Sequence, residues 1–465
     1  MRGITAWGTY LPFRRLDRSE IAAVAGKGGG RGTRTVASFD EDPTTMAVEA
    51  GPHAMRSSGV RPDLLLFGSV LPAYADKTNA TAVHAALRLD ERAGAFDLGS
   101  SSRSAMAGLL LATCGHGSTM VAAGDIRTGM AGSADESAGG DAGSAIVIGD
   151  HQDGAPVLAE IIGSASRTAE FIDRWRTPGE PHSKTWDDKF AQITYIPLGA
   201  DAFTTALTDA GLEADQVSAV AVSAPTSRIG TAVAKKLGVA TVVDDFSKTV
   251  GQCGAAQPGL LLAHLLESAS PGDVVALVSV SDGADALLLR ITDAMADRTG
   301  APTVAEQAAG GAPVSYGKYL SWRGILQVDP PRRPEPQRVS ATAAARSDDW
   351  KFGFVGSEDP ETGSVHLPPL RVSADGERTD QMIDRPMADI EGTIATFTID
   401  RVAYSPSPPI VFAVVDFDGG GRLPLEVCDC DQDEVVIGAR VNMTFRRLYT
   451  ADGIPNYFWK ARLLR

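Results

Sequence analysis

Short, continuously apolar runs alternate with helical patterns along residues 1–295 of the chain. Runs of Val, Ile, Leu and Ala without polar alternation are typical of strands that are buried on both faces of a sheet. The predicted strands are Ile4–Leu11, Leu64–Ser69, Met120–Asp125, Ala145–Gly149, Val217–Ser223, Val274–Val280 and Ala286–Ile291. The predicted helices are Pro43–Arg56, Ala80–Leu89, Ser102–Thr113, Ala202–Ala210, Gly230–Leu237 and Ala255–Ser268. Strands that alternate with helices indicate an α/β domain.

One pattern occurs twice in this region. MVAAGD at 120–125 is followed by GSAIVIGD at 143–150, and this pair is similar to VVALVSVSDGADALLLRI at 274–291, where the turn is tighter. Each pair follows a helical pattern rich in Gly and Ala, which predicts two similar α/β halves. Chance is the alternative, because strands rich in Ala and Val resemble one another.

The composition changes after residue 295. Residues 296–347 contain blocks rich in Ala, Gly, Pro and Arg and read as a linker, in which the amphipathic segment SYGKYLSWRGIL is expected to dock on a domain surface. Residues 348–465 are predicted to be all-β. The predicted strands lie in IEGTIATFTID, PPIVFAVVDFD, GRLPLEVCD, ARVNMTFRRL and YFWKARLL. Five short strands fit a small barrel of the OB type better than the alternative, a β-sandwich.

Charge and cysteine content narrow the possible functions. The chain of 465 residues has 43 basic and 58 acidic side chains and a net charge of −15, which argues against a nucleic-acid or anionic-membrane partner. Four cysteines cannot form a disulfide framework in a chain of this length. The first residues lack the pattern of a signal peptide, and no apolar run reaches the about 18 residues of a membrane span. These features predict a cytoplasmic protein.

Several segments resemble a known superfamily, in the same order along the chain. They are GTRTVASFDEDPTTMAVEA, FDLGSSSRSAMAGLLLA, AAGDIRTGMAGSADESAGGDAGSAIVIGD, FIDRWRTPGEPHSK, AVSAPTSRIGTAVAKKLG and VGQCGAAQPGLLLAHLL. They resemble HMG-CoA synthases and ketoacyl-ACP synthase III enzymes of the thiolase superfamily. HLPP and IEGTIATFTIDRV resemble the acyl-CoA-associated OB-fold family (domain of unknown function 35).

The resemblance implies a five-layered α/β/α/β/α thiolase-like domain with two similar halves, followed by a small all-β OB-fold barrel. It also implies a homodimer and a tunnel of pantetheine size for an acyl-CoA or an acyl-carrier-protein thioester. A thiolase-type enzyme uses a cysteine at the start of a buried helix, where free N–H groups stabilise the thiolate.

By the family pattern, four catalytic positions carry other residues in this chain. The family cysteine falls on Ser102, the histidine on Ser223, the asparagine on Gln252 and the acid/base glutamate on Val70. A serine hydroxyl needs a general base within hydrogen-bond reach, whereas the Gln252 amide can still polarise a carbonyl.

The candidate bases in this half of the chain are His84, His116 and His182, although each of them also suits a structural role. His182 lies in a segment that forms the substrate-side wall in relatives. The segment GKGGGRGTRT lacks the GK[ST] ending of a phosphate-binding loop and reads as a flexible loop. Its Arg31 and Arg34 are nonetheless candidates for contact with a CoA phosphate.

No metal or other cofactor is expected. The OB-fold relatives usually hold zinc with two CxxC pairs, but the matching positions here are Asp359, Thr362, Ser373 and Gly376. Cys428 and Cys430 share one face of a predicted strand without further ligands nearby. The run DCDQDE is not a calcium loop, since Glu434 occupies the position of the turn glycine and Arg440 that of the bidentate glutamate.

Three functions stay open at this point. The first is an acyltransferase or C–C bond enzyme that depends on acyl-CoA or acyl carrier protein and uses Ser102. The second is a catalytically inactive acyl-CoA-binding partner or scaffold for a separate thiolase-type subunit. The third is a retro-aldol lyase that acts on an acyl-CoA. Loss of nucleophile, base, amide and acid together argues against condensation of the family type, because these groups act as a unit.

Overall fold

The computed structural model describes residues 1–151, 154–298 and 301–465, which form two compact units. The first unit comprises Met1–Ala37, Asp42–Thr81 and Asp90–Leu320. The second comprises Ser38–Glu41, Ala82–Leu89 and Ser321–Arg465. Across the described ranges, every helix is too short or too polar to span a lipid bilayer.

The first half of the first unit is built on a sheet of strand order β5-β4-β6-β7-β1. β4 pairs in parallel with β5 and β6, whereas β7 is antiparallel to both β6 and β1. The elements are β1 (Arg2–Tyr10), α2 (Pro43–Ser58), β4 (Leu64–Gly68), β5 (Gly94–Asp97), α4 (Ser104–Cys114), β6 (Thr119–Asp125) and β7 (Ala142–Asp150). α3 (Ala80–Ala86) follows β4 in the chain but belongs to the second unit from Ala82 on.

The second half repeats this topology. Its strand order is β11-β12-β13-β8, and Val242 bridges to Val220 in parallel on the far side of β11, in the place that β5 occupies in the first half. The elements are β8 (Ala159–Arg167), α6 (Asp188–Ala210), β11 (Ala219–Ser223), α7 (Ser227–Leu237), α8 (Gln257–Glu267), β12 (Val274–Val280) and β13 (Ala284–Ile291). The predicted duplication is therefore confirmed, and β1 pairs with β8 where the halves meet.

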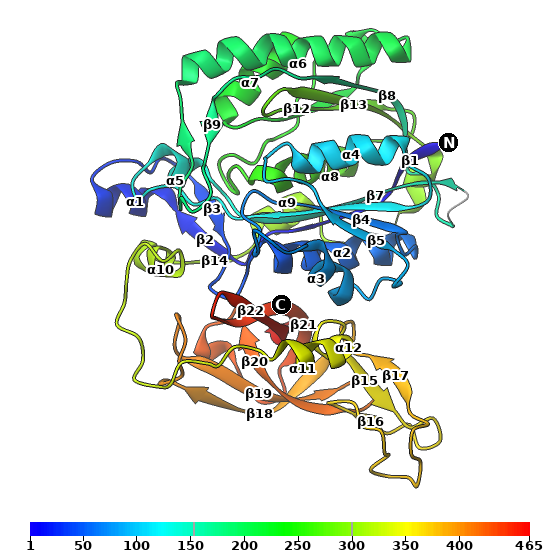
Figure 1. Cartoon of the computed structure of the whole chain (residues 1–465). Coiled ribbons are helices and arrows are strands. Elements are labelled where there is room, and N and C mark those ends of the chain that lie inside the picture. Colours follow the sequence, from blue (N-terminus) through cyan, green and yellow to red (C-terminus); the bar gives the residue numbers. More distant parts are fainter. Residues whose placement is uncertain (152–153, 299–300) are drawn as a thin grey trace. The chain divides into compact units, whose positions relative to one another are not determined.

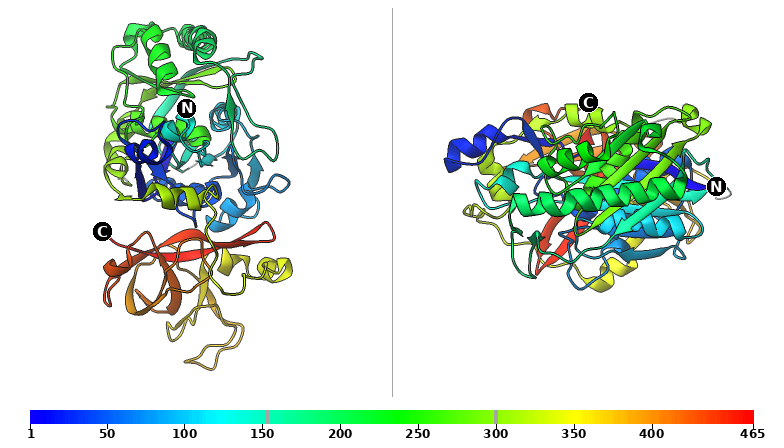
Figure 2. Two further views of the ribbon diagram at one scale, coloured as in Figure 1. Left: turned by 90° about the vertical axis from the view of Figure 1, so that its left-hand side faces the viewer. Right: turned by 90° about the horizontal axis from the view of Figure 1, so that it is seen from above.

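These elements form five layers within the first unit (Figure 1). α4 and α8 lie between the two half-sheets, α6 and α7 cover the outer face of the second half, and α2 covers the outer face of the first. Figure 2 shows α6 lying across the strands of its half. The central layer is apolar and buried, with Met106 and Leu109 on α4 and Leu261 and Leu265 on α8 at most 1% exposed. The five-layered fold predicted from the resemblance is confirmed.

The helices and strands differ from prediction most clearly at α6, β8, β5 and α4. α6 begins at Asp188 rather than Ala202, because Pro197 and a largely exposed first half conceal its helical pattern. β8 and β5 were not predicted, since β8 is half-buried and rich in polar residues and β5 has only four residues. α4 begins at Ser104, so that Ser102 lies in the turn before the helix rather than in its first turn.

Small elements complete the first unit. β14 pairs with β2, and β2 pairs with β3, to form a three-stranded sheet. Val304 on α9 and Tyr319 on α10 are fully buried, and the first unit runs through them to Leu320. The elements are β2 (Arg14–Asp17), α1 (Arg18–Ala25), β3 (Thr33–Val36), α5 (Ala134–Ala138), β9 (Arg174–Trp175), β10 (Lys184–Thr185), α9 (Val304–Ala309), β14 (Ala312–Pro313) and α10 (Tyr316–Trp322).

The second unit contains a closed five-stranded barrel of order β18-β19-β20-β22-β21. Its strands lie in the five segments predicted from alternation, and Trp459 packs against both Phe445 and Phe354 in its core. A three-stranded sheet, β16-β15-β17, precedes the barrel. The elements are α11 (Ala341–Arg346), α12 (Asp348–Lys351), β15 (Val355–Glu358), β16 (Val365–His366), β17 (Ile383–Pro386), β18 (Gly392–Asp400), β19 (Ile410–Phe417), β20 (Arg422–Cys428), β21 (Arg440–Ala451) and β22 (Ile454–Leu463).

Candidate functional site

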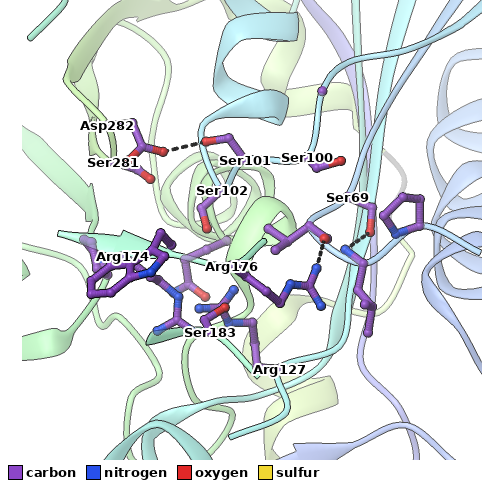
Figure 3. Close-up of a pocket in the computed structure, with 18 of the residues that line it drawn as sticks. Ser69, Ser100, Ser101, Ser102, Arg127, Arg174, Arg176, Ser183, Ser281 and Asp282 are labelled. Atoms are coloured by element: carbon purple, nitrogen blue, oxygen red, sulfur yellow. Dashed lines mark hydrogen bonds between the residues drawn. The ribbon is translucent and has the colours of Figure 1, made fainter. Parts of the chain in front are cut away.

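A cavity of about 890 Å³ opens in the first unit, where the ends of strands from both halves meet the start of α4. β4, β5 and the turn before α4 supply one side of it, and β11 and β12 supply another. Three residues that the sequence pattern predicted at catalytic positions line this cavity with hydrogen-bonding groups: Ser102, Ser223 and Gln252. Val70, at the fourth predicted position, lines it as well. Figure 3 shows Ser102 among the lining residues.

Hydrogen bonds hold the turn that carries Ser102 between β5 and α4. Ser104 donates its hydroxyl to Gly99 O at 2.9 Å, and Ser101 Oγ donates to Asp282 Oδ2 at 2.8 Å. Ser101 Oγ also accepts the Arg103 N–H at 3.1 Å. These contacts leave the half-buried Ser102 facing the cavity just ahead of the free N–H groups of α4.

Gln252 is held through its backbone. Its N–H donates to Ala138 O at 2.8 Å, and its carbonyl accepts the Gly140 N–H at 2.9 Å. Gly251 has φ of +97°, and a Cβ there would lie 2.3 Å from Gly139 O, so only glycine fits beside Gln252. The backbone therefore fixes the place of the amide on the cavity wall.

Among the described residues, no imidazole is placed to activate Ser102. In the described part of the chain, no histidine lines the cavity, and the Ser102 hydroxyl has no hydrogen-bond partner. His84 belongs to the second unit, and His116 is exposed in the turn after the far end of α4. His182 places Nδ1 3.4 Å from Thr128 O, and its neighbour Ser183 lines the cavity instead. None of the three candidate bases is therefore in place.

A cysteine near the site is not available as a thiolate. Cys253 is fully buried, and its thiol donates to Gly251 O at 3.5 Å. Burial raises the pKa of the Cys253 thiol far above its usual value, so the thiolate does not form at neutral pH.

The carboxylates that line the cavity already have partners. Asp97 accepts the Asn79 and Ala80 N–H groups at 2.8 Å each, and Asp282 accepts the Ser101 hydroxyl. Hydrogen bonding from Lys184 lowers the pKa of Glu180 to about 2, so this group is ionised and a poor base. The cavity thus presents hydroxyl and amide groups to a ligand without a built-in general base.

The two arginines predicted to contact CoA lie elsewhere. Arg31 is exposed and does not line the cavity. Arg34 is fully buried, forms an ion pair with Asp141 at 3.2 Å, and donates to Arg127 O at 2.8 Å. The prediction for Arg34 is wrong, because the β2–β3 pairing carries it into the interior, where its guanidinium group is already bound.

Three other arginines line the cavity and were missed. Arg127 follows β6, and Arg174 and Arg176 lie at β9 and just after it (Figure 3). Arg174 binds Asp135 through two hydrogen bonds of 2.6 and 2.8 Å, and Arg176 donates to Val70 O at 2.6 Å. The string FIDRWRTPGE was the available signal, since it was already recognised as part of the resemblance.

The residues at the zinc-ribbon positions do not fit zinc. Thr362 N lies 3.4 Å from Asp359 Oδ1, and a Cβ at Gly376 would lie 2.6 Å from Asp359 Oδ2 and 3.4 Å from Ser373 Oγ, so the positions are close together. Structural zinc takes four Cys or His ligands, whereas this cluster offers one carboxylate. Arg378 lies 3.7 Å from that carboxylate and forms an ion pair with it. Among the described residues no group of three or more potential ligands is placed to hold a metal ion.

The chain is similar to several hydroxymethylglutaryl-CoA synthases. It is 30% identical to the enzyme of Archaeoglobus fulgidus over 355 residues, which is 70% of this chain and 100% of the relative. It is 29% identical to the enzyme of Methanothermobacter thermautotrophicus over 354 residues, again 70% and 100% of the two chains. The model of the family "ChsH2, C-terminal OB-fold domain" matches residues 384–446 of this chain.

Solved structures share the fold of the first unit. MvaS in complex with 3-hydroxy-3-methylglutaryl coenzyme A superposes with a TM-score of 0.59 at 20% identity, over 72% of this chain and 94% of that one. FabH, the 3-oxoacyl-(acyl carrier protein) synthase III of Pseudomonas aeruginosa, gives 0.55 at 21% identity, over 65% and 99%. Together with the sequence relatives, these likenesses place the chain in the hydroxymethylglutaryl-CoA synthase family of the thiolase superfamily, with an OB-fold domain of the ChsH2 type at its C-terminus.

Proposed function

We propose that the first unit binds an acyl-CoA or acyl-carrier-protein thioester in this cavity and transfers its acyl group, with Ser102 as the acceptor. One observation carries the proposal: Ser102, Ser223 and Gln252 converge on one cavity, and the Ser102 hydroxyl has no hydrogen-bond partner among the described residues. The Gln252 amide and the N–H groups at the start of α4 are donors for the oxyanion that forms during acyl transfer.

The proposed step exchanges one bond for another. Ser102 Oγ forms a bond to the acyl carbon, the C–S bond breaks, and the hydroxyl proton leaves with the thiol. Since no imidazole takes part, acylation of Ser102 is expected to be slow beside that of a family cysteine.

Intact-mass spectrometry tests this proposal directly. The full chain is incubated with a set of acyl-CoA thioesters, alongside the Ser102→Ala variant and, as the matched control, Ser270→Ala at an exposed serine outside the cavity. The proposal expects an adduct of acyl mass in the wild type and in Ser270→Ala but not in Ser102→Ala. Absence of an adduct with every thioester would contradict it.

A second candidate is a catalytically inactive acyl-CoA-binding partner for another thiolase-type subunit. The absence of histidine from the described cavity lining favours it, because binding needs no base. Affinity purification from the native host distinguishes the two. Co-purification of a thiolase-type subunit, together with acyl-CoA binding and no adduct, supports the second candidate. A chain that purifies alone and turns over a thioester contradicts it.

Dimer formation through the first unit is part of the proposal. β5 is the outermost strand of its half-sheet, and Phe96 on this strand is 57% exposed. An exposed strand edge with a large apolar side chain suits antiparallel pairing with a second copy. Light scattering should report a dimer for the wild type and a monomer for Phe96→Asp, and a wild-type monomer would contradict the proposal.

A further inference from the structure

A second cavity, of about 730 Å³, lies within the second unit and takes no part in the proposed function. Its walls come from two stretches of the chain, the segment 321–333 and the loop 401–409 that joins β18 to β19. Pockets that hold small organic ligands have volumes of about 300–1,000 Å³. The second cavity therefore has the size of a ligand site.

One part of this cavity is apolar, although the chain leaves it open to solvent. Leu326, Val328 and Val402 line it and are 46%, 63% and 51% exposed. Pro330 and Pro408 line it as well, and their rings restrict the backbone of both walls. Aliphatic side chains that are exposed together in one hollow are typical of a surface that an apolar group covers.

The other part of the cavity is rich in arginine. Arg332, Arg333 and Arg401 line it, in a chain whose net charge is −15. Within the residues that the structure describes, their guanidinium groups form no hydrogen bond or ion pair with the protein, whereas nearby in the chain Arg338 pairs with Asp452 at 3.1 Å. The N–H donors of three guanidinium groups are thus available to a ligand, and a carboxylate matches such a group with two parallel hydrogen bonds.

Acidic groups close to these arginines limit the charge of the ligand. Asp329 lines the cavity, and Asp400 accepts the Val402 N–H at 2.9 Å. Burial and the neighbouring Glu335 carboxylate raise the pKa of Tyr404, so this lining phenol keeps its proton and can donate to a ligand. With three carboxylates near three arginines, the cavity suits a single negative charge better than a polyphosphate.

We infer that the second cavity binds an aliphatic carboxylate of the fatty-acid type. Its hydrocarbon tail lies against the three aliphatic side chains, and its carboxylate accepts hydrogen bonds from the guanidinium groups. A nucleotide fits less well, because the wall is mainly aliphatic and gives a base few aromatic faces for stacking. This inference does not depend on the function proposed for the first unit.

Calorimetric titration of the full chain with four probes tests the inference. Decanoate has both parts of the expected ligand, decan-1-ol has the same tail without the charge, acetate has the head group without the tail, and CoA has several charges without an aliphatic tail. Arg401→Met removes a donor, and Val402→Asp places a charge on the apolar wall. The matched controls are Arg346→Met and Ile437→Asp, at exposed residues outside both cavities.

The wild type and both controls should bind one decanoate per chain, about 5- to 30-fold more tightly than decan-1-ol, and should bind acetate far more weakly. Arg401→Met should lose this preference while its affinity for decan-1-ol stays the same, and Val402→Asp should lose both ligands. Both variants should melt with the wild type, because Arg401 and Val402 are exposed. Equal affinity of the wild type for decanoate and decan-1-ol, or no binding of decanoate, would overturn the inference.

Limited digestion with trypsin reports where decanoate binds. Decanoate should slow cleavage after Arg332 and Arg401, which line the second cavity, but not after Arg346. Decanoate binding that is lost in Val70→Trp and kept in Val402→Asp would place the ligand in the cavity of the first unit and overturn the inference. Binding of CoA that is tighter than that of decanoate and is lost in Arg401→Met would assign the arginines to phosphate and also overturn it.

Discussion

Arg103, the residue after Ser102, donates two hydrogen bonds to Asp285. Nε donates to Oδ2 at 2.7 Å, and Nη2 donates to Oδ1 at 2.8 Å. Asp285 lies on β13 and its side chain is only 2% exposed. Arg103 Nη1 also donates to Asp282 O at 2.8 Å. One guanidinium group therefore ties the start of α4 in the first half to a strand and a turn of the second half.

Removing this guanidinium should destabilise the first unit. Arg103→Met leaves the Asp285 carboxylate buried with Ser166 as its remaining side-chain partner, which is expected to lower the free energy of unfolding by about 2–4 kcal/mol. Urea denaturation of the full chain measures the change, and exposed Arg92→Met should stay within about 0.5 kcal/mol of the wild type. Equal midpoints for Arg103→Met and the wild type would show that the pair contributes nothing.

Asp125 makes stability depend on pH near the cavity. Burial raises its pKa from 3.8 to about 6, although Arg127 and the Ala255 and Ile126 N–H groups act against the rise. The folded chain therefore binds more protons than the unfolded chain between these two pKa values, so the contribution of Asp125 to stability falls as pH rises from about 4 to 6. The full loss above pH 6 amounts to about 3 kcal/mol.

The Asp125→Asn variant has no titratable group at this position. It therefore lacks the pH dependence that Asp125 gives to the free energy of unfolding. The difference in free energy of unfolding between wild type and variant should change by about 2.4 kcal/mol from pH 4 to pH 7, whatever its absolute size. Parallel pH profiles for the two proteins would rule out a raised pKa at Asp125.

In the second unit, Lys460 is buried between two carboxylates. Its Nζ lies 2.9 Å from Asp40 Oδ2 and 2.6 Å from Glu426 Oε2, and the Lys460 and Asp40 side chains are each 1% exposed. Lys460→Met leaves the buried Asp40 without this cation and is expected to cost about 3–5 kcal/mol. Tryptophan fluorescence during urea unfolding reports the loss, with exposed Lys27→Met as control. If the variant is as stable as the wild type, another group stabilises the Asp40 carboxylate and Lys460 is not needed for this.

The cluster around Asp359 should be independent of zinc. Asp359, Thr362, Ser373 and Gly376 occupy the ribbon positions without a thiol or imidazole, and Arg378 supplies the positive charge. Chelator treatment should leave the melting temperature of the full chain unchanged, and elemental analysis should find no zinc. Replacing all four residues by cysteine should create zinc binding. Zinc at one ion per chain in the natural protein would contradict this account.

Continuous apolar strands were the most predictable part of the fold. β4, β6, β11 and β12 are buried almost throughout, so their sequences carry a strong signal. β8 is only half-buried, and its second half, GSASR, has the small and polar residues that are typical of loops. α6 was predicted only over its buried end, because propensity rules treat Pro197 as a break although the helix continues through it.

The convergence of four candidate residues was predictable, because they were matched to motifs by their spacing in the sequence. Ser102, Ser223, Gln252 and Val70 line one cavity. Arg127 was not predictable, since a charge after a strand reads as solvent-exposed and only the fold shows its burial. Arg34 illustrates the reverse error: it follows a glycine-rich loop, yet the strand that begins at Thr33 takes it into the interior.

Binding of an acyl thioester in the cavity is the central claim, and calorimetric titration of pentanoyl-CoA tests it most directly. Val70→Trp fills the cavity from its wall, and Leu111→Trp adds the same side chain at a 59% exposed position outside it. The wild type and Leu111→Trp should bind one pentanoyl-CoA per chain, with binding at least about tenfold weaker in Val70→Trp. No binding to the wild type, or equal binding to Val70→Trp, would contradict the claim.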